Sequence, residues 1–188
     1  MKVDLANRVA LVTGAARGIG QAIADQLAAN GALVYYSDVD GAEAGRAAAR
    51  SPGAVAVEMD VRNEHEVLAV TQEIRRKHGR IDILVNNAGV NTLHHRVPID
   101  QFPREEWDRI VEVDLTGLYL VSRAVAGVMR SQNWGRIINI SSVVGLVPLR
   151  LQCAFAAAKA GVVNLTKAMA IELGREGVTV NALAPGSI

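Results

Sequence analysis

The sequence predicts an α/β protein, a doubly wound parallel sheet in three layers with helices on both faces. Short apolar runs rich in Val and Ile alternate with longer amphipathic stretches along the chain. The runs are apolar on both faces, as parallel strands buried between helices are. Strand and helix in strict alternation favour right-handed crossovers within one sheet. Half of the 188 residues are apolar, so a sizeable core can form.

Each element follows from its own stretch of sequence. The apolar runs predict six strands, at 8–14, 32–38, 54–60, 81–89, 135–142 and 177–186. The stretches between them predict helices at 18–30, 40–50, 64–78, 104–131 and 154–175. In the third helix Val67, Val70 and Ile74 fall on one face, with charges elsewhere. No linker or low-complexity run divides the chain, so we expect residues 1–188 to form a single domain.

Composition excludes several classes of function. The formal net charge is +1, which argues against nucleic acid or an anionic membrane as the main partner. No uninterrupted apolar run approaches the ~18 residues of a membrane span. The N-terminus has an early Asp4 and no small-residue cleavage site, which argues against a secretory signal. A single cysteine, Cys153, excludes an internal disulfide. We therefore expect a cytoplasmic protein.

A glycine-rich segment follows the first expected strand and opens the first helix. Gly14, Gly18 and Gly20 are spaced G-x-x-x-G-x-G within "VTGAARGIG". Small residues here let the backbone turn tightly and let a pyrophosphate approach the N–H groups at a helix N-terminus. Alone, such glycines could mark a simple turn. Their place between a strand and an amphipathic helix predicts dinucleotide binding on a Rossmann-like sheet.

Asp38 ends the second strand and bears on the choice of dinucleotide. A carboxylate at this place can accept hydrogen bonds from the adenosine ribose hydroxyls and would repel a 2′-phosphate. Asp40 and Glu43 supply a capping pair for the next helix, which leaves Asp38 free. Arg17 favours NADP instead, because its positive charge could bind a 2′-phosphate. We expect NAD as the cofactor.

Asp60 ends the third strand in the same way. Asn63 and Glu66 can cap the helix that follows, so Asp60 is expected to be free to contact adenine.

Several motifs occur in the order of one family. "TGAARGIG", the strand ending at Asp38, "NNAG" (86–89), "NISS" (139–142), a lysine helix and "VNALAPG" (180–186) together resemble the short-chain dehydrogenase/reductase family. The resemblance implies hydride transfer between NAD(P) and a small-molecule alcohol or carbonyl. It also implies a homodimer or homotetramer that pairs through the helices expected at 104–131 and 154–175.

The resemblance assigns roles residue by residue. Ser142 matches the serine that hydrogen-bonds the substrate oxygen, and Lys159 matches the lysine that holds the nicotinamide ribose and lowers the pKa of the family tyrosine. A strand-end serine that only satisfies backbone groups, and an exposed helix lysine, are the plainer alternatives. Beyond Gly14, Arg17, Gly18, Gly20, Asp38 and Asp60, the implied cofactor contacts are Ile19, Val61, Asn87, Ala88, Gly89, Lys159, Pro185, Gly186 and Ile188.

Two catalytic positions depart from the family pattern. Phe155 stands where the family has its tyrosine, and it has no group that can transfer a proton. General acid–base catalysis contributes roughly 10²–10⁴-fold, so we expect little hydride transfer. Asp114 stands where the family has an asparagine. Its side chain matters little if the position works through its carbonyl, but a carboxylate that reaches Lys159 would favour the charged lysine.

The expected activity is NAD(H)-dependent interconversion of a secondary alcohol and a ketone, disabled by Phe155. A natural non-catalytic NAD-binding or scaffold protein of the same fold is the alternative. Because family members continue beyond "PGSI", we also expect this chain to lack a seventh strand and part of the substrate pocket, which leaves a sheet edge uncovered.

Other polar residues give weaker signals. His94 and His95 cannot easily share one metal and have no ligand cluster beside them, so no metal site is expected. Arg96, Arg150 and Gln152 are candidates for facing the substrate. Cys153 is expected to be a small packed residue rather than a nucleophile.

Overall fold

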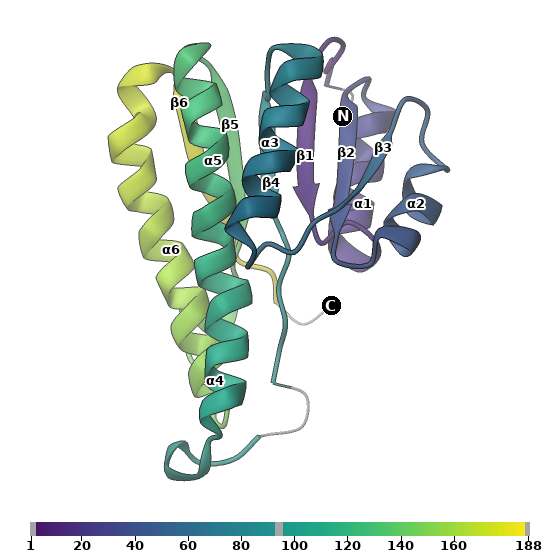
Figure 1. The fold of residues 1–188 in the computed structure, drawn as a ribbon. Helices are drawn as coiled ribbons and strands as arrows, with labels where there is room; N and C mark the ends of the chain where they lie inside the picture. The colour runs from purple at the N-terminus through teal and green to yellow at the C-terminus, as the bar shows by residue number, and fades with distance from the viewer. Residues whose placement is uncertain (1–2, 93–95, 187–188) are drawn as a thin grey trace.

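Six parallel strands form one sheet in the computed structural model, which describes residues 3–92 and 96–186 (Figure 1). Their order across the sheet is β3-β2-β1-β4-β5-β6. The strands are β1 Val9–Thr13, β2 Leu33–Asp38, β3 Val55–Glu58, β4 Ile83–Asn86, β5 Gly135–Ile140 and β6 Val178–Leu183. The order reverses direction between β1 and β4. In doubly wound sheets this is where ligands bind.

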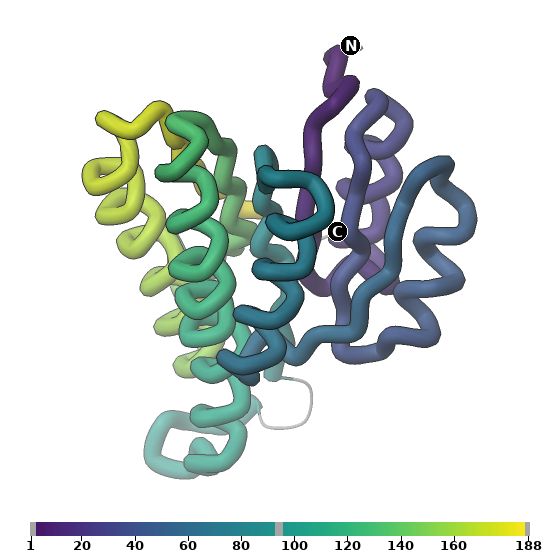
Figure 2. The backbone as a smooth tube through the Cα atoms, turned by 45° about the horizontal axis from the view of Figure 1, so that its top comes forward, coloured from purple at the N-terminus to yellow at the C-terminus, as the bar shows by residue number. Residues whose placement is uncertain are grey.

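Helices cover the sheet on two sides, as the sequence predicts. In Figure 2, α3, α5 and α6 lie side by side in one layer, and α1 and α2 pack on β1, β2 and β3. The α-helices are α1 Gly18–Ala29, α2 Gly41–Ala48, α3 Glu64–His78, α4 Arg104–Val111, α5 Leu118–Ser131 and α6 Cys153–Leu173. Short 3₁₀ turns are η1 Ile99–Gln101, η3 Val143–Gly145 and η4 Gly174–Glu176. The predicted strands and helices are therefore confirmed, with ends that differ by a few residues.

Two hydrophobic cores lie on opposite faces of the sheet. Along β1, Val9 and Leu11 join the core beneath α3, α5 and α6. Ala10 and Val12 alternate with them and join the core beneath α1 and α2. A strand buried on both faces must be apolar throughout, which explains the unbroken apolar run in the sequence.

Asp40 and Asn63 both cap the helices that follow them, as predicted. The Asp40 carboxylate accepts a hydrogen bond from the Glu43 N–H at 2.9 Å at the start of α2. At the start of α3 the Asn63 side chain accepts from the N–H groups of His65 and Glu66 at 3.1 and 3.4 Å. These bonds satisfy N–H groups that have no partner within the helix.

The helix expected at 104–131 forms without a break, but its hydrogen-bonding pattern changes partway along. A π-helical turn, η2 (Glu112–Gly117), separates α4 from α5. Within it the fully buried Asp114 accepts a hydrogen bond from the Val90 N–H at 2.7 Å. Gly117 packs so closely on Val61 that an added Cβ would lie 2.7 Å from its side chain. Such turns are frequent at functional sites.

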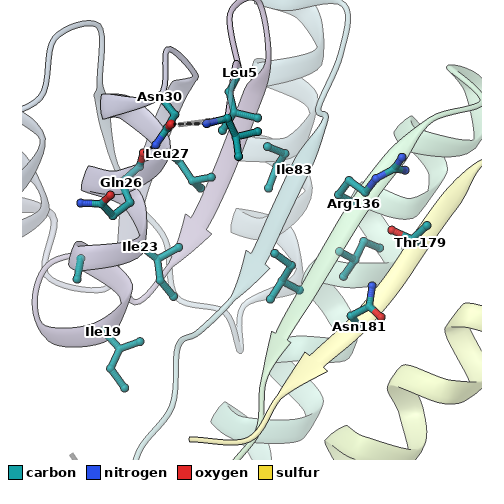
Figure 3. Close-up of a pocket in the computed structure, with 14 residues that line it drawn as sticks. Leu5, Ile19, Ile23, Gln26, Leu27, Asn30, Ile83, Arg136, Thr179 and Asn181 are labelled. Atoms are coloured by element: carbon teal, nitrogen blue, oxygen red, sulfur yellow. Dashed lines mark hydrogen bonds between the residues drawn. The ribbon is translucent and has the colours of Figure 1, made fainter. Parts of the chain in front are cut away.

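An apolar groove opens on the face of the sheet that carries α1. It has a volume of about 690 Å³ and runs from α1 across β4 and β5 to β6 (Figure 3). Ile19, Ile23 and Leu27 line its α1 side, while Thr179 and Asn181 of β6 line the other. The groove is lined mainly by carbon.

One stretch has the length and apolar composition of a membrane span. It comprises Cys153–Glu176, with a mean hydropathy of 1.2. In the fold, Met169 and Leu173 of this stretch are buried in the core beneath α3, α5 and α6. Core helices of α/β proteins commonly meet the same criterion.

Candidate active site

Two cavities meet beyond the carboxyl ends of the strands. The first, about 510 Å³, is lined by residues that include Gly14, Arg17, Asp38 and Asp60. The second, about 380 Å³, is lined by residues that include Asp114, Ser142, Phe155, Lys159 and Gly186. Both share Ile19, Asn87, Gly89 and Val90. Together they form one elongated site across the reversal of strand order, where doubly wound sheets bind ligands.

The glycine loop requires glycine for two different reasons. Gly14 and Gly18 have φ values of 64° and 61°, in the left-handed region that glycine adopts readily. Gly20 instead allows close packing, because an added Cβ would lie 2.2 Å from the Gly14 carbonyl oxygen. A Cβ added to Gly18 would meet nothing within 4 Å. This open space beside the start of α1 fits a pyrophosphate at a helix N-terminus.

Asn87 lines both cavities and also braces this loop. Its Nδ2 donates hydrogen bonds to the carbonyl oxygens of Thr13 and Gly14, both at 3.0 Å. The Ala88 N–H donates to the Thr13 hydroxyl at 3.1 Å. Ala88 and Gly89 then follow along the first cavity. The expected segment is therefore in place, and its asparagine positions the phosphate loop.

Asp38 ties the end of β2 to the same loop. One carboxylate oxygen accepts from the Ala16 N–H and the other from the Asp40 N–H, both at 3.1 Å. As predicted, Asp40 rather than Asp38 caps α2. Each carboxylate oxygen retains a further acceptor site. Arg17 is exposed and lines the same cavity.

Asp60 is not free, which corrects the prediction. Its carboxylate is held by the Arg62 guanidinium, with Nε 3.0 Å from each oxygen and Nη2 2.6 Å from Oδ2. The side-chain hydrogen bonds from Arg62 lower the pKa of Asp60. Both residues line the first cavity beside Val61. The predicted contact with adenine would therefore involve a carboxylate that is already paired.

Lys159 lies buried between the sheet and the π turn. Its Nζ donates to the Ile140 carbonyl oxygen and lies at the same distance, 3.1 Å, from Oδ2 of Asp114. The Ser141 hydroxyl donates to the Lys159 carbonyl oxygen at 2.9 Å, which fixes the backbone of α6 against β5. An exposed helix lysine is thereby ruled out. The ammonium faces the cavity from a fixed position.

Asp114 reaches Lys159, which settles the question left by the sequence. Burial raises the pKa of the Asp114 carboxyl above its ordinary value, and the Lys159 charge and the Val90 N–H offset only part of that rise. The positive charge of Arg109 on α4 acts in the same direction as Lys159. The Asp114 side chain is thus fully buried, with Oδ2 3.1 Å from the Lys159 ammonium.

Ser142 and Phe155 complete the second cavity. The Ser142 Oγ accepts from the Val144 N–H at 3.2 Å, which caps η3 and leaves its O–H to donate. Phe155 is half-buried and packs beside Ile110 and Val90. Its ring centroid lies 5.6 Å from the Lys159 Nζ. The four predicted catalytic positions are therefore brought together, and the aromatic one has no proton to give.

The remaining predicted residues divide between neighbouring surfaces. Pro185 and Gly186 line the second cavity, and the Pro185 carbonyl oxygen accepts from the Val143 N–H at 3.0 Å. Arg96 and Gln152 line it as well, whereas Arg150 and Cys153 line an adjoining hollow. Ile188, His94 and His95 lie outside the described residues. Within the described ranges, no three His, Cys, Asp or Glu side chains gather as a metal site.

Sequence reasoning missed three residues that shape the site. Arg62 holds Asp60, and Val90 holds Asp114 through its backbone. Arg109 lines the first cavity and donates from Nη2 to the Asn91 carbonyl oxygen at 3.0 Å. An arginine two residues after a strand-end aspartate was a usable local signal for Arg62. The other two depend on contacts between distant segments.

The fold and the site define a dinucleotide-binding α/β protein, and comparisons with known proteins identify its family. A sequence profile described as short chain dehydrogenase matches residues 8–188. A 3-oxoacyl-[acyl-carrier-protein] reductase of Synechocystis is 44% identical over 191 residues, covering 98% of this chain and 75% of the relative. A galactitol 2-dehydrogenase of Agrobacterium fabrum is 39% identical over 186 residues, covering 98% and 72%. The crystal structure of an NAD+-bound xylitol dehydrogenase superimposes with a TM-score of 0.92 at 32% identity, covering 98% and 72%.

The chain belongs to the short-chain dehydrogenase family. It is an oxidoreductase of that type, and the family uses nicotinamide cofactors and small-molecule substrates.

Proposed function

We propose that this protein is an NAD(H)-dependent oxidoreductase that interconverts a secondary alcohol and a ketone, and that Phe155 makes this form slow or inactive. The observation that carries the proposal is the placement of Ser142 and Lys159 in a cavity continuous with the glycine-loop cavity. Relatives named for galactitol, xylitol and a 3-oxoacyl group are consistent with a secondary alcohol or its ketone.

The chain's own residues would divide the work. A bound nicotinamide supplies the hydride acceptor or donor. Ser142 would hold the substrate oxygen through its free O–H, and Lys159 would hold the nicotinamide ribose with its fixed ammonium. Phe155 lines the same cavity, but it cannot take or return the hydroxyl proton.

The preference for NAD over NADP rests on Asp38. Its carboxylate lines the first cavity at the end of β2 and is oriented by two backbone N–H groups. A 2′-phosphate there would meet a negative charge with little freedom to move away. Arg17 is exposed and lies in the same cavity, so it is the residue that would weaken this preference.

A natural non-catalytic NAD-binding or scaffold protein is the second candidate, and the packing of Phe155 favours it. The ring joins the apolar cluster around Ile110, and Lys159 has its charge paired with Asp114. Such a site is stable without a substrate. A protein of this class would bind NADH and keep its fold, yet gain no turnover when a tyrosine is introduced.

The deciding experiment is a substrate screen of the parent and of Phe155→Tyr, read as NADH absorbance with polyols and 3-oxoacyl thioesters. NADH binding is measured in parallel by fluorescence. Turnover only in the variant supports the enzyme. NADH binding by both proteins without turnover in either supports the binding protein.

We also propose a cytoplasmic, single-domain homodimer or homotetramer that pairs through α4, α5 and α6. Tyr119 on α5 and Ile171 on α6 are exposed at 44% and 82%, and pairing through these helices would cover both side chains. Light scattering at two concentrations, with Ile171→Lys as the disrupting variant, tests this. A monomeric parent contradicts it.

A further inference from the structure

Asp114 and Phe155, the two departures from the family pattern, lie against the same lysine. The Asp114 Oδ2 is 3.1 Å from the Lys159 Nζ, and the Phe155 ring centroid is 5.6 Å from it. A Cβ added to Gly89 would lie 3.1 Å from that carboxylate oxygen and 3.3 Å from the ammonium. Hence the carboxylate, the ammonium and the ring face one small space.

The charges in this space nearly cancel. Lys159 on α6 and Asp114 in the π turn form a buried pair, with side chains 7% and 0% exposed. Arg109 on α4 acts on Asp114 from outside the pair and is itself bound by Glu106. Arg96 lines the outer part of the second cavity and is exposed. Ser142 on the β5 side is neutral. The field at the ring is therefore that of an ion pair rather than of a lone cation.

We propose that Asp114 is a positioning residue that neutralises Lys159, so that Asp114 and Phe155 form a matched pair. While the carboxylate is present, a tyrosine at position 155 lacks the uncompensated cation that would stabilise its phenolate. A phenyl ring needs no such cation and tolerates the paired lysine. This inference rests on the proposed function and adds that Phe155→Tyr alone restores the site only in part.

General electrostatics gives the direction of the effect. An opposite charge within ~4–6 Å lowers the pKa of an acidic group by about 1–3 units. A carboxylate bound to that cation removes most of this effect at a site close to both charges. Asp114→Asn removes the negative charge, is nearly the same size, and keeps an oxygen to accept the Val90 N–H.

The test compares Phe155→Tyr with the double variant Phe155→Tyr, Asp114→Asn by NMR titration of ring-¹³C-labelled tyrosine. The parent spectrum contains only Tyr35, Tyr36 and Tyr119, so the extra resonance belongs to the introduced phenol. We expect that phenol to titrate at least about one unit lower in the double variant than in the single one. An equal or higher value in the double variant overturns the proposal.

A third variant tests whether the change in the phenol pKa comes from the Lys159 charge or from a structural rearrangement. Adding Lys159→Met to the double variant removes the cation, and the phenol pKa should rise again by a similar amount. If it stays low, the shift has another source and the proposal fails. Circular dichroism of all proteins confirms that the fold is kept.

The titration needs no substrate, so the two proposals can fail separately. A lower phenol pKa in the double variant without any turnover supports this inference and contradicts the proposed function. Full turnover by the single variant, with a phenol pKa already low, supports the function and contradicts this inference. If both hold, the pH of half-maximal turnover falls by about one unit on adding Asp114→Asn.

Discussion

Asn87 donates two hydrogen bonds to Thr13, one from its backbone and one from its side chain. The Asn87 N–H donates to the Thr13 hydroxyl, and the Asn87 side-chain amide donates to the Thr13 carbonyl oxygen, both at 3.0 Å. The end of β1 is thereby fixed to the end of β4 at the base of the glycine loop. The loop's shape thus depends on a residue far away in the sequence.

Gly20→Ala should damage this arrangement directly. The added Cβ would lie 2.2 Å from the Gly14 carbonyl oxygen and 2.3 Å from the Asn87 Nδ2. We expect a loss of about 1–3 kcal/mol in the free energy of unfolding, and NADH binding at least about tenfold weaker. Urea denaturation and fluorescence titration measure the two effects. The control is Gly45→Ala in α2, which meets nothing within 4 Å and should stabilise by about 0.4–1 kcal/mol.

Cofactor preference should depend on Asp38. NADH is expected to bind at least about tenfold more tightly than NADPH, or about 1.4 kcal/mol. Asp38→Ser should narrow that gap, since it removes the charge that repels a 2′-phosphate. Arg17→Ala is the opposing control and should widen the gap. If the parent instead prefers NADPH and Arg17→Ala abolishes that preference, the assignment of NAD as the cofactor is refuted.

Introducing the missing phenol should restore chemistry. Phe155→Tyr is expected to raise turnover by roughly 10²-fold or more. Phe102→Tyr is the matched control, because Phe102 packs with the same apolar cluster but does not line the cavity that holds Lys159. Robust turnover by the Phe155 parent that is lost when another acid–base residue is replaced would contradict the assignment of position 155 as the proton-transfer position.

Stability in acid should depend on Asp82. Burial raises the pKa of this carboxyl, but hydrogen bonds from Arg80, the Val9 N–H and Arg8 outweigh burial and hold the pKa below its ordinary value. The folded state therefore gains stability that is present above the unfolded pKa of ~3.9 and is lost as the pH falls through the folded pKa. Asp82→Asn should cost about 1–2 kcal/mol at pH 7.

Acid should reduce that cost, because the parent progressively loses the stability that the ionised carboxyl contributes as the pH falls below the unfolded pKa. Urea denaturation of both proteins near pH 7 and near pH 3 measures the change. Asp108→Asn, which breaks the exposed pair with Arg104, is the control and should have little effect at either pH. An Asp82→Asn cost that does not vary with pH would contradict the role given to these hydrogen bonds.

Local patterns were sufficient for most of the fold. The strands are buried on both faces, so apolar runs such as the one containing Leu11 marked them directly. Asp40 and Asn63 act on N–H groups within three residues, which is why their capping roles could be predicted. The glycine loop could be predicted for the same reason, since Gly14, Gly18 and Gly20 lie close together in the sequence.

Contacts between distant segments explain what was missed. The pairing of Asp114 with Lys159 was left open by the sequence, because it depends on how the long helix packs against α6 and no local pattern records that packing. The π turn is hidden for a similar reason, since residues 104–131 read as ordinary helix when their partners are unknown. Asp60 is different, because its partner Arg62 is only two residues away and local reasoning overlooked it.

The π turn also acts as a phase shift in the long helix. A turn closed by i→i+5 hydrogen bonds contains about one residue more than an α turn, and one residue corresponds to about 100° of rotation about the helix axis. Val121 and Val125 can therefore face the sheet while Asp114 faces Lys159. Deleting one residue within 112–117 should leave the composition almost unchanged, yet it would rotate α5 relative to α4 about the helix axis. Either Val121 and Val125 would then turn away from the sheet, or Asp114 would turn away from Lys159.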